Sequence, residues 1–187
     1  MRTLVPTFVR IALIACCALL FQGTGFAQSN LVINGGFETG DFAGWTTSSG
    51  CSAIVASFGE PLECFGGFIN QVPPHSGTWA TIFPQEAPGT ISQAITTNPR
   101  ASYELSFWLI AVDNGFGFSP NSFSVSWGGA TLFSATNIVT SGYLEFRFVD
   151  LVPAGDNTVL SFTGSDTPAA LGLDDVSVRR KRGEKSE

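Results

Sequence analysis

Hydrophobic and polar residues alternate along several short segments of this chain. In residues 122–127 every second position is apolar, which is the pattern of a strand with one buried face. The segment 102–110 begins with the same alternation and then becomes apolar on both faces. It is predicted to be a central strand, or a strand that carries Trp108 on a recessed outer face. The same criteria predict further strands at residues 53–58, 78–83, 90–95, 143–151, 157–164 and 171–178.

Turn-forming residues separate these segments. No segment of adequate length shows the three- and four-residue spacing of an amphipathic helix. Many short strands punctuated by Gly, Pro, Asn and Asp are typical of an antiparallel sandwich, and not of a parallel sheet covered by helices. No internal repeat or linker interrupts the series. The sequence therefore predicts an all-β fold, an antiparallel β-sandwich, in one domain over residues 28–178.

The first 27 residues differ from the rest of the chain. A basic start precedes the apolar run 11–21, and small residues end the segment at Ala27. We interpret residues 1–27 as a secretory signal peptide, since a bilayer span needs about 20 apolar residues. A lipoprotein box ending at Cys16 is the alternative, but the apolar run continues past that cysteine. The predicted localisation is secreted, either extracellular or in the cell envelope, with no membrane span in the mature chain.

Export determines how the two remaining cysteines are interpreted. Cys51 and Cys64 would lie in an oxidising compartment, where a disulfide is the usual state of such a pair. A bridge over this short loop would contribute about 3 kcal/mol. Zinc requires a fuller ligand set than two cysteines and the single His75, and a redox motif requires closer spacing. His75 itself, between Pro74 and Ser76, is interpreted as an exposed loop residue.

Charge is distributed unevenly along the chain. Arg100 and Arg147 are the only basic residues of the body 28–178, which holds 13 of the 15 Asp and Glu residues (15 minus the two in the last four positions). Nucleic acid binding is excluded, because phosphate backbones need clustered Lys and Arg. An acidic body suits calcium, neutral sugars or basic partners. The basic end, residues 179–187, is interpreted as a disordered tail.

Carboxylates near both ends of the body are candidate metal ligands. Glu38 follows a glycine turn, and Asp174 and Asp175 interrupt the last apolar segment. Successive strand residues face opposite sides, so one aspartate should point inward unless a bulge intervenes. An inward carboxylate needs a partner, and the body offers few cations. Because the first and last strands of a sandwich often lie side by side, we predict a structural Ca²⁺ site that joins Glu38 to Asp174 or Asp175. The alternative is a turn with an exposed Glu.

Four motifs carry a resemblance to known proteins. They are Asn34-Gly-Gly-Phe-Glu followed by Trp45, then Ser76-Gly77, Tyr103-Glu-Leu-Ser-Phe-Trp and Leu173-Asp-Asp-Val-Ser-Val. Their order resembles the galactose-binding-like jelly rolls of carbohydrate-binding module families 4 and 9. In detail the chain is similar to small exported bacterial proteins with a PEP-CTERM sorting tail, which share the stretches 34–45 and 120–129. The resemblance covers about residues 30–178.

The resemblance implies a function and a metal. Carbohydrate-binding families of this kind hold a structural calcium with a Glu at the Glu38 position, a carboxylate at the Asp174 position and main-chain carbonyls nearby. We assign Gly36 as one of those carbonyls. The sorting tail itself is missing: the basic cluster is present after the last strand, but the Pro-Glu-Pro motif and the helix are not. This favours a freely released protein.

Sugar-binding sandwiches use exposed aromatic rings and nearby polar side chains. The candidates in this sequence are Trp79, Trp108, Trp127 and Tyr143, with Asn114 and Asn121 in a glycine-rich loop. Core packing is the alternative for each tryptophan, because buried aromatics dominate sandwich cores.

An enzyme is not predicted. A Ser or Cys nucleophile needs a base, and the single histidine has no nucleophile elbow beside it. A glycosidase needs two carboxylates facing each other across a cleft, and no motif suggests one. The predicted function is a secreted, non-catalytic, carbohydrate-binding-like module whose partner is an extracellular polysaccharide. The alternative is a structural or adhesive protein of the matrix or cell surface.

Overall fold

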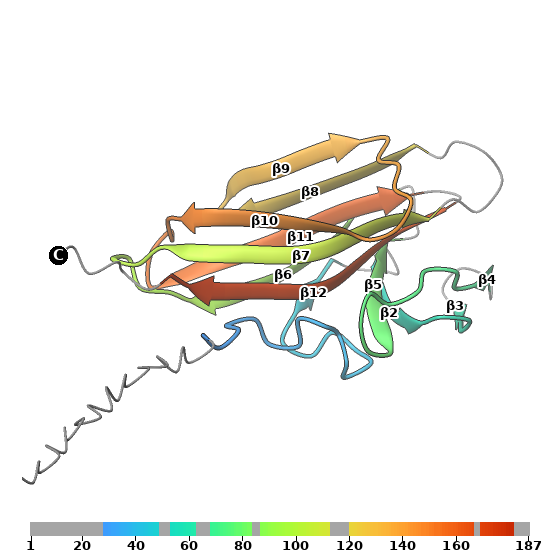
Figure 1. The fold of residues 1–187 in the computed structure, drawn as a ribbon, viewed down its shortest axis with the longest axis horizontal. Coiled ribbons are helices and arrows are strands. Elements are labelled where there is room, and N and C mark those ends of the chain that lie inside the picture. Colours follow the sequence, from blue (N-terminus) through green and yellow to red (C-terminus); the bar gives the residue numbers. More distant parts are fainter. Residues whose placement is uncertain are drawn as a thin grey trace, which may run out of the picture.

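The computed structural model describes residues 28–48, 53–62, 68–83, 87–112, 120–166 and 169–181. They form two five-stranded antiparallel sheets packed as a sandwich, with a small two-stranded hairpin at one end (Figure 1). No helix occurs among these residues, so the predicted all-β sandwich is confirmed. The described part of the chain accordingly contains no helix capable of crossing a membrane. The predicted signal peptide 1–27, the cysteines Cys51 and Cys64, and Asn114 lie outside the described residues.

Each sheet mixes strands from both halves of the sequence. The first sheet has the order β1 (Thr46–Thr47), β6 (Gly89–Thr96), β11 (Asn157–Asp166), β8 (Asn121–Trp127) and β9 (Ala130–Thr136). The second has the order β10 (Leu144–Leu151), β7 (Tyr103–Val112), β12 (Ala170–Arg180), β5 (Trp79–Phe83) and β2 (Ile54–Ser57). The hairpin pairs β3 (Pro61–Leu62) with β4 (Phe68–Ile69).

β9 is a strand that the sequence pattern did not predict. Its register against β8 shifts between Val125 and Ser126, so that Leu132 is an extra residue. The shift lets Leu132 and its neighbour Phe133 both pack against the core. A β-bulge of this kind breaks the period-two alternation on which a strand prediction depends.

Inward-facing aromatic side chains fill the space between the sheets. Phe107 on β7 lies at their centre, fully buried. Its ring lies 5.1 Å from Phe162 and 5.9 Å from Phe123 on the first sheet, centroid to centroid. It also stacks on Phe146 of β10 at 5.2 Å. This cluster joins the two sheets into one core.

The outer faces of the two sheets differ in chemistry. On the first sheet, Ser or Thr occupies most outward positions, and residues of neighbouring strands form rows such as Ser92, Ser161 and Ser126. Among the described residues, the outward positions of these strands include no charged side chain. The outer face of the second sheet carries Trp108 together with Glu104, Glu145 and Arg147. Aromatic and charged chemistry is therefore concentrated on the second sheet.

The last strand is longer than predicted. β12 continues to Arg180, with Arg179 opposite Glu104 and Arg180 opposite Tyr103 on β7. The N–H of Lys181 also donates to the carbonyl of Ser102 at 2.8 Å. The prediction that the disordered tail begins at residue 179 was therefore wrong. An exposed strand end tolerates long charged side chains, because they point into solvent while the backbone continues its ladder.

Candidate functional site

The N-terminal segment lies beside the last strand. The N–H of Leu31 donates to the carbonyl of Val178, and the N–H of Val176 donates to the carbonyl of Gly35, each at 2.8 Å. The side chain of Asn30 adds two bonds to the backbone of the same strand. The two ends of the body are thus adjacent, as we predicted, and Glu38 lies close to the end of this pairing.

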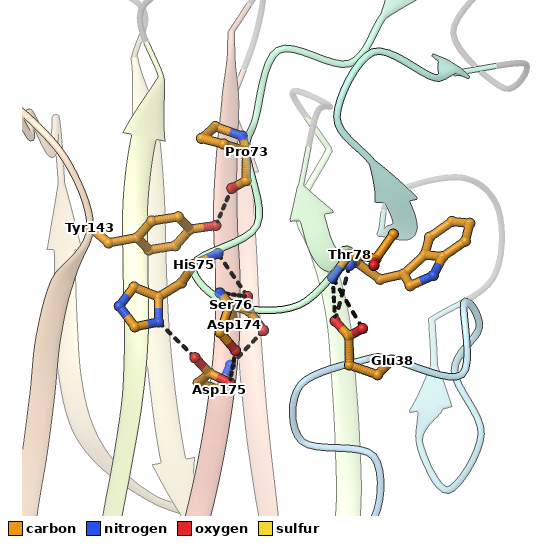
Figure 2. Close-up of polar contacts among 9 residues, drawn as sticks. Glu38, Pro73, His75, Ser76, Thr78, Tyr143, Asp174 and Asp175 are labelled. Carbon is orange, nitrogen blue, oxygen red and sulfur yellow. Dashed lines mark hydrogen bonds and ion pairs between the residues drawn. The ribbon is translucent and has the colours of Figure 1, made fainter.

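A bulge in β12 turns its two aspartates toward one segment. The register against β7 shifts between Asp174 and Ser177, and Asp175 has a φ of 49°, in the left-handed region. Both carboxylates consequently contact residues 73–78, which cross the outer side of the second sheet before β5 begins and are called the strap below (Figure 2). The inward-versus-outward alternation expected of a regular strand does not hold here.

Asp174 is a buried carboxylate bound by main-chain amides. Its Oδ2 accepts from the N–H groups of His75 at 2.8 Å and Ser76 at 3.2 Å. Its Oδ1 accepts from the N–H of Asp175 at 2.7 Å. Burial nevertheless raises the pKa of Asp174 to about 6, against these hydrogen bonds, and the charge of Asp175 adds to the rise. No ion pair to Asp174 is present among the described residues.

His75 packs between aromatic rings and the second aspartate. Its Nδ1 lies 2.6 Å from Asp175 Oδ2. Its ring stacks on Trp108 with centroids 3.8 Å apart and planes 15° apart, and meets Tyr143 edge-on at 5.2 Å. The interpretation of His75 as an exposed loop residue was therefore wrong. Its partners lie 33 to 100 positions away in the sequence, and no local pattern indicates them.

Tyr143 binds the start of the strap. Its hydroxyl donates to the carbonyl of Pro73 at 2.8 Å. Burial, followed by the charges of Asp174 and Asp175, raises the pKa of Tyr143 well above its usual value. The phenol therefore stays protonated and remains a hydrogen-bond donor. Tyr143 and Trp108, both predicted as ligand-binding residues, are brought together by the structure.

Glu38 binds the other end of the strap. Both carboxylate oxygens accept from the N–H of Thr78 at 3.0 Å, and Oε1 also accepts from the N–H of Trp79 at 3.0 Å (Figure 2). Gly77, just before these amides, has a φ of 64°. A side-chain carbon at Gly77 would collide with the Glu38 carboxylate. Glycine is required at this position for both reasons.

Replacement of Gly77 tests this contact. We expect Gly77→Ala to lower the free energy of unfolding by about 1 to 3 kcal/mol, through left-handed strain and displacement of Glu38. Gly59→Ala is the matched control, because Gly59 has a φ of 82° but nothing within 4 Å of the added carbon. Urea unfolding of the two variants separates the cost of the left-handed conformation from the cost of displacing Glu38. Equal losses would show that the contact with Glu38 adds nothing.

The carboxylates offer part of a calcium site. A carbon placed on Gly36 would lie 3.4 Å from Asp175 Oδ1 and 3.9 Å from Asp174 Oδ1, so these groups surround Gly36. However, within the ranges that the structure describes, no three His, Cys, Asp or Glu side chains form a group that could hold a metal. Glu38 points to the end of the strap, and the aspartates point to its middle (Figure 2). Calcium here would need main-chain carbonyls as well.

Two of the predicted ligand-binding residues have structural roles. Trp127 is only 3% exposed, and its Nε1–H donates to the carbonyl of Val152 at 2.8 Å. Asn121 is buried, and its amide group binds both the N–H and the carbonyl of Ile138. The predictions for Trp127 and Asn121 were wrong, because the alternation of β8 directs both side chains inward. A core tryptophan and an outward one follow the same sequence pattern.

Trp79 is half-buried at the edge of the core. Its ring lies against Gly40, where an added side-chain carbon would be 3.3 Å from two ring atoms, and it packs against the main core cluster. Trp79 therefore lies apart from the group formed by Trp108, Tyr143 and His75. Of the tryptophans predicted to bind sugar, Trp108 is the one on the outer face of the second sheet.

Charged side chains lie next to Trp108 on the same face. Arg147 Nη1 donates to Glu104 Oε1 at 2.7 Å, and Nη2 donates to Glu145 Oε1 at 3.0 Å. The hydrogen bond that Arg147 donates to Glu145 and the charge of Glu104 raise the pKa of Arg147 further above its usual value. Glu145 is directly opposite Trp108 in the register of β10 and β7. The face thus presents aromatic rings and hydrogen-bonding groups side by side.

The fold is similar to that of solved carbohydrate-binding modules. TmCBM61, solved with β-1,4-galactotriose, has a TM-score of 0.57 and 18% identity, over 82% of this chain and 99% of that chain. The CBM22-1 xylan-binding domain of Paenibacillus barcinonensis Xyn10C has a TM-score of 0.52 and 18% identity, over 82% and 96%. The enzymatically active domain of bacteriophage CBA120 tailspike protein 4 has a TM-score of 0.55 and 14% identity, over 81% and 21%.

These likenesses define the fold class. No family model matches the chain, and no curated protein matches it either. At identities below a fifth, similarity of structure establishes the fold alone, a jelly-roll β-sandwich of the architecture found in carbohydrate-binding modules. The two modules named above belong to families 61 and 22, and not to families 4 and 9, which the motifs resemble.

Proposed function

We propose that this protein is a secreted, non-catalytic carbohydrate-binding module, with Trp108 and Tyr143 in its ligand site. The observation that carries the proposal is the placement of Trp108 on the outer face of the second sheet, where Trp108 and Tyr143 both meet the ring of His75. Glu145 and Arg147 lie beside them as hydrogen-bonding groups. A ring that offers stacking next to polar side chains is the arrangement that sugar recognition uses. The carbohydrate-binding neighbours support the proposal through their fold.

Binding to a soluble polysaccharide tests the proposal. β-1,4-Galactan and xylan are suitable probes, because the neighbours are described with a galactotriose and with xylan. We expect saturable binding by isothermal titration calorimetry, weakened at least about tenfold by Trp108→Ala, as the loss of a stacked aromatic predicts. Val159→Ala, on the exposed outer side of the first sheet, should bind like the wild type. Equal loss in both variants, or binding independent of Trp108, would place the site elsewhere.

We also propose a structural calcium ion beside the strap. The support is Asp174, a buried carboxylate without an ion-pair partner in the described residues, which lies with Asp175 around the glycine turn at Gly36. Glu38 follows this turn, although its carboxylate binds the end of the strap. Calcium is coordinated by about six to eight oxygens from carboxylates, main-chain carbonyls and water, so main-chain carbonyls and water would complete the set that Asp174 and Asp175 begin. The ion would neutralise Asp174 and join the N-terminal segment to β12. We further propose that the segment 1–27 directs export of the protein. We also propose that the protein is related to PEP-CTERM-type proteins and to carbohydrate-binding module families 4 and 9.

A further inference from the structure

The outer side of Trp108 is already covered by the protein's own strap. The imidazole of His75 lies parallel to the indole, 3.8 Å away between centroids. This is the position that the flat face of a ligand ring takes when it stacks on an aromatic side chain. The His75 side chain is 27% exposed, so its other side reaches solvent. His75 therefore separates the outer face of the Trp108 ring from solvent.

The strap is held mainly by polar contacts. Pro73 is bound by Tyr143, His75 and Ser76 are bound by the two aspartates, and Thr78 is bound by Glu38 (Figure 2). Within residues 73–78 no side chain is fully buried. Segments with few buried apolar contacts and exposed hydrogen bonds open locally at a lower free energy than the core does. The strap can therefore detach from Trp108 while the sandwich stays folded.

We propose that the strap is an internal competitor for the aromatic binding site, and that His75 must leave Trp108 before a sugar ring can stack there. This inference rests on the proposed function, because it gives the ligand the place that His75 occupies. The apparent affinity of such a site is reduced by the fraction of molecules in which the strap is open. Loosening the strap should therefore strengthen ligand binding. Removal of the His75 ring is expected to raise affinity, whereas removal of an aromatic ring that contacts the ligand lowers it.

The first test needs no ligand. Acrylamide quenching of tryptophan fluorescence should increase in His75→Ala, and Trp108→Phe in the same background should remove the increase. Thr78→Ala is the matched control, since Thr78 is exposed and contributes its main-chain N–H to the strap's attachment. Circular dichroism and thermal melts establish that each variant is folded. Unchanged quenching in a folded His75→Ala variant would overturn the inference.

The second test measures affinity for β-1,4-galactan and xylan. We expect His75→Ala to bind about tenfold more tightly than the wild type, as a closed strap in nine molecules of ten predicts. His75→Phe keeps a ring on Trp108 and should bind no more tightly than the wild type. If the wild type binds and His75→Ala binds equally or more weakly, the competitor role is wrong although the proposed function stands. If neither protein binds these glycans, the proposed function is contradicted, and the competitor role with it.

Discussion

Chelation of calcium is expected to lower the melting temperature of this protein by about 5 to 10 °C. The value follows from about 2.7 kcal/mol of stabilisation at a hundredfold excess of metal over its Kd and a shift of about 2 to 4 °C per kcal/mol for a domain of this size. The physical cause is Asp174, whose charge is buried without an ion-pair partner among the described residues. A bound cation would remove that cost.

The pH dependence of stability should change sign with the metal. In chelator, Asp174 has a pKa of about 6 in the folded protein, above its value of 3.8 in the unfolded chain. The folded state then binds this proton more tightly, so the contribution of Asp174 to stability is greatest below pH 4 and falls as the pH rises toward 6, by about 2 kcal/mol. With calcium, protons compete for the carboxylate, so stability should instead fall as the pH is lowered through the same range.

Asp174→Asn tests whether this carboxyl is responsible both for the effect of calcium and for the pH dependence of stability. The variant should lose the calcium-dependent rise in melting temperature, and in chelator it should lose the decline in stability between pH 4 and 6. Asp41→Asn is the matched control, because Asp41 lies in the same N-terminal region, is exposed and is bound by Thr39 and Ala43. It should change neither behaviour. If neither calcium nor chelator changes the melting temperature of the wild type, the calcium proposal is wrong.

The architecture could be predicted because its signals are local. The alternation in 122–127 and 102–110 and the turn residues between strands each depend on a few neighbouring positions, and β8 and β7 follow them closely. β9 departs from that pattern because a bulge turns Leu132 and Phe133 to the same side. A period-two criterion fails wherever an extra residue enters a strand.

Only one part of the site could be predicted, namely the part that depends on the pairing of the first and last segments of the chain. Glu38 could be placed near β12, because the first and last segments of a sandwich often pair. The strap could not be predicted, because His75 meets Asp175 across 100 positions and Trp108 across 33. The sequence shows a histidine between Pro74 and Ser76, and nothing in that context identifies the ring that it covers. Long-range contacts of single side chains have no local signature.

Two neighbouring residues on β7 should affect different properties when each is replaced by alanine: Phe107 mainly the stability of the fold, and Trp108 mainly the binding of glycan. Phe107 points inward and contacts aromatic rings of both sheets, including Phe162 and Phe146. Phe107→Ala is therefore expected to cost about 3 to 5 kcal/mol in unfolding free energy, from lost burial and the cavity that remains. Trp108 points outward against His75, and Trp108→Ala should cost only about 1 kcal/mol while it removes glycan binding.

Urea unfolding and titration of the two variants with glycan measure both effects. If Phe107→Ala stays folded at room temperature, it should retain the wild-type affinity per folded molecule, because its side chain lies on the far side of the strand from the ligand. Comparable stability losses in the two variants would mean that the Trp108 face is packed like a core and is closed to ligands. A large loss confined to Phe107 would instead establish that the inner face of β7 stabilises the sandwich, and that the outer face can exchange the strap for a ligand without loss of the fold.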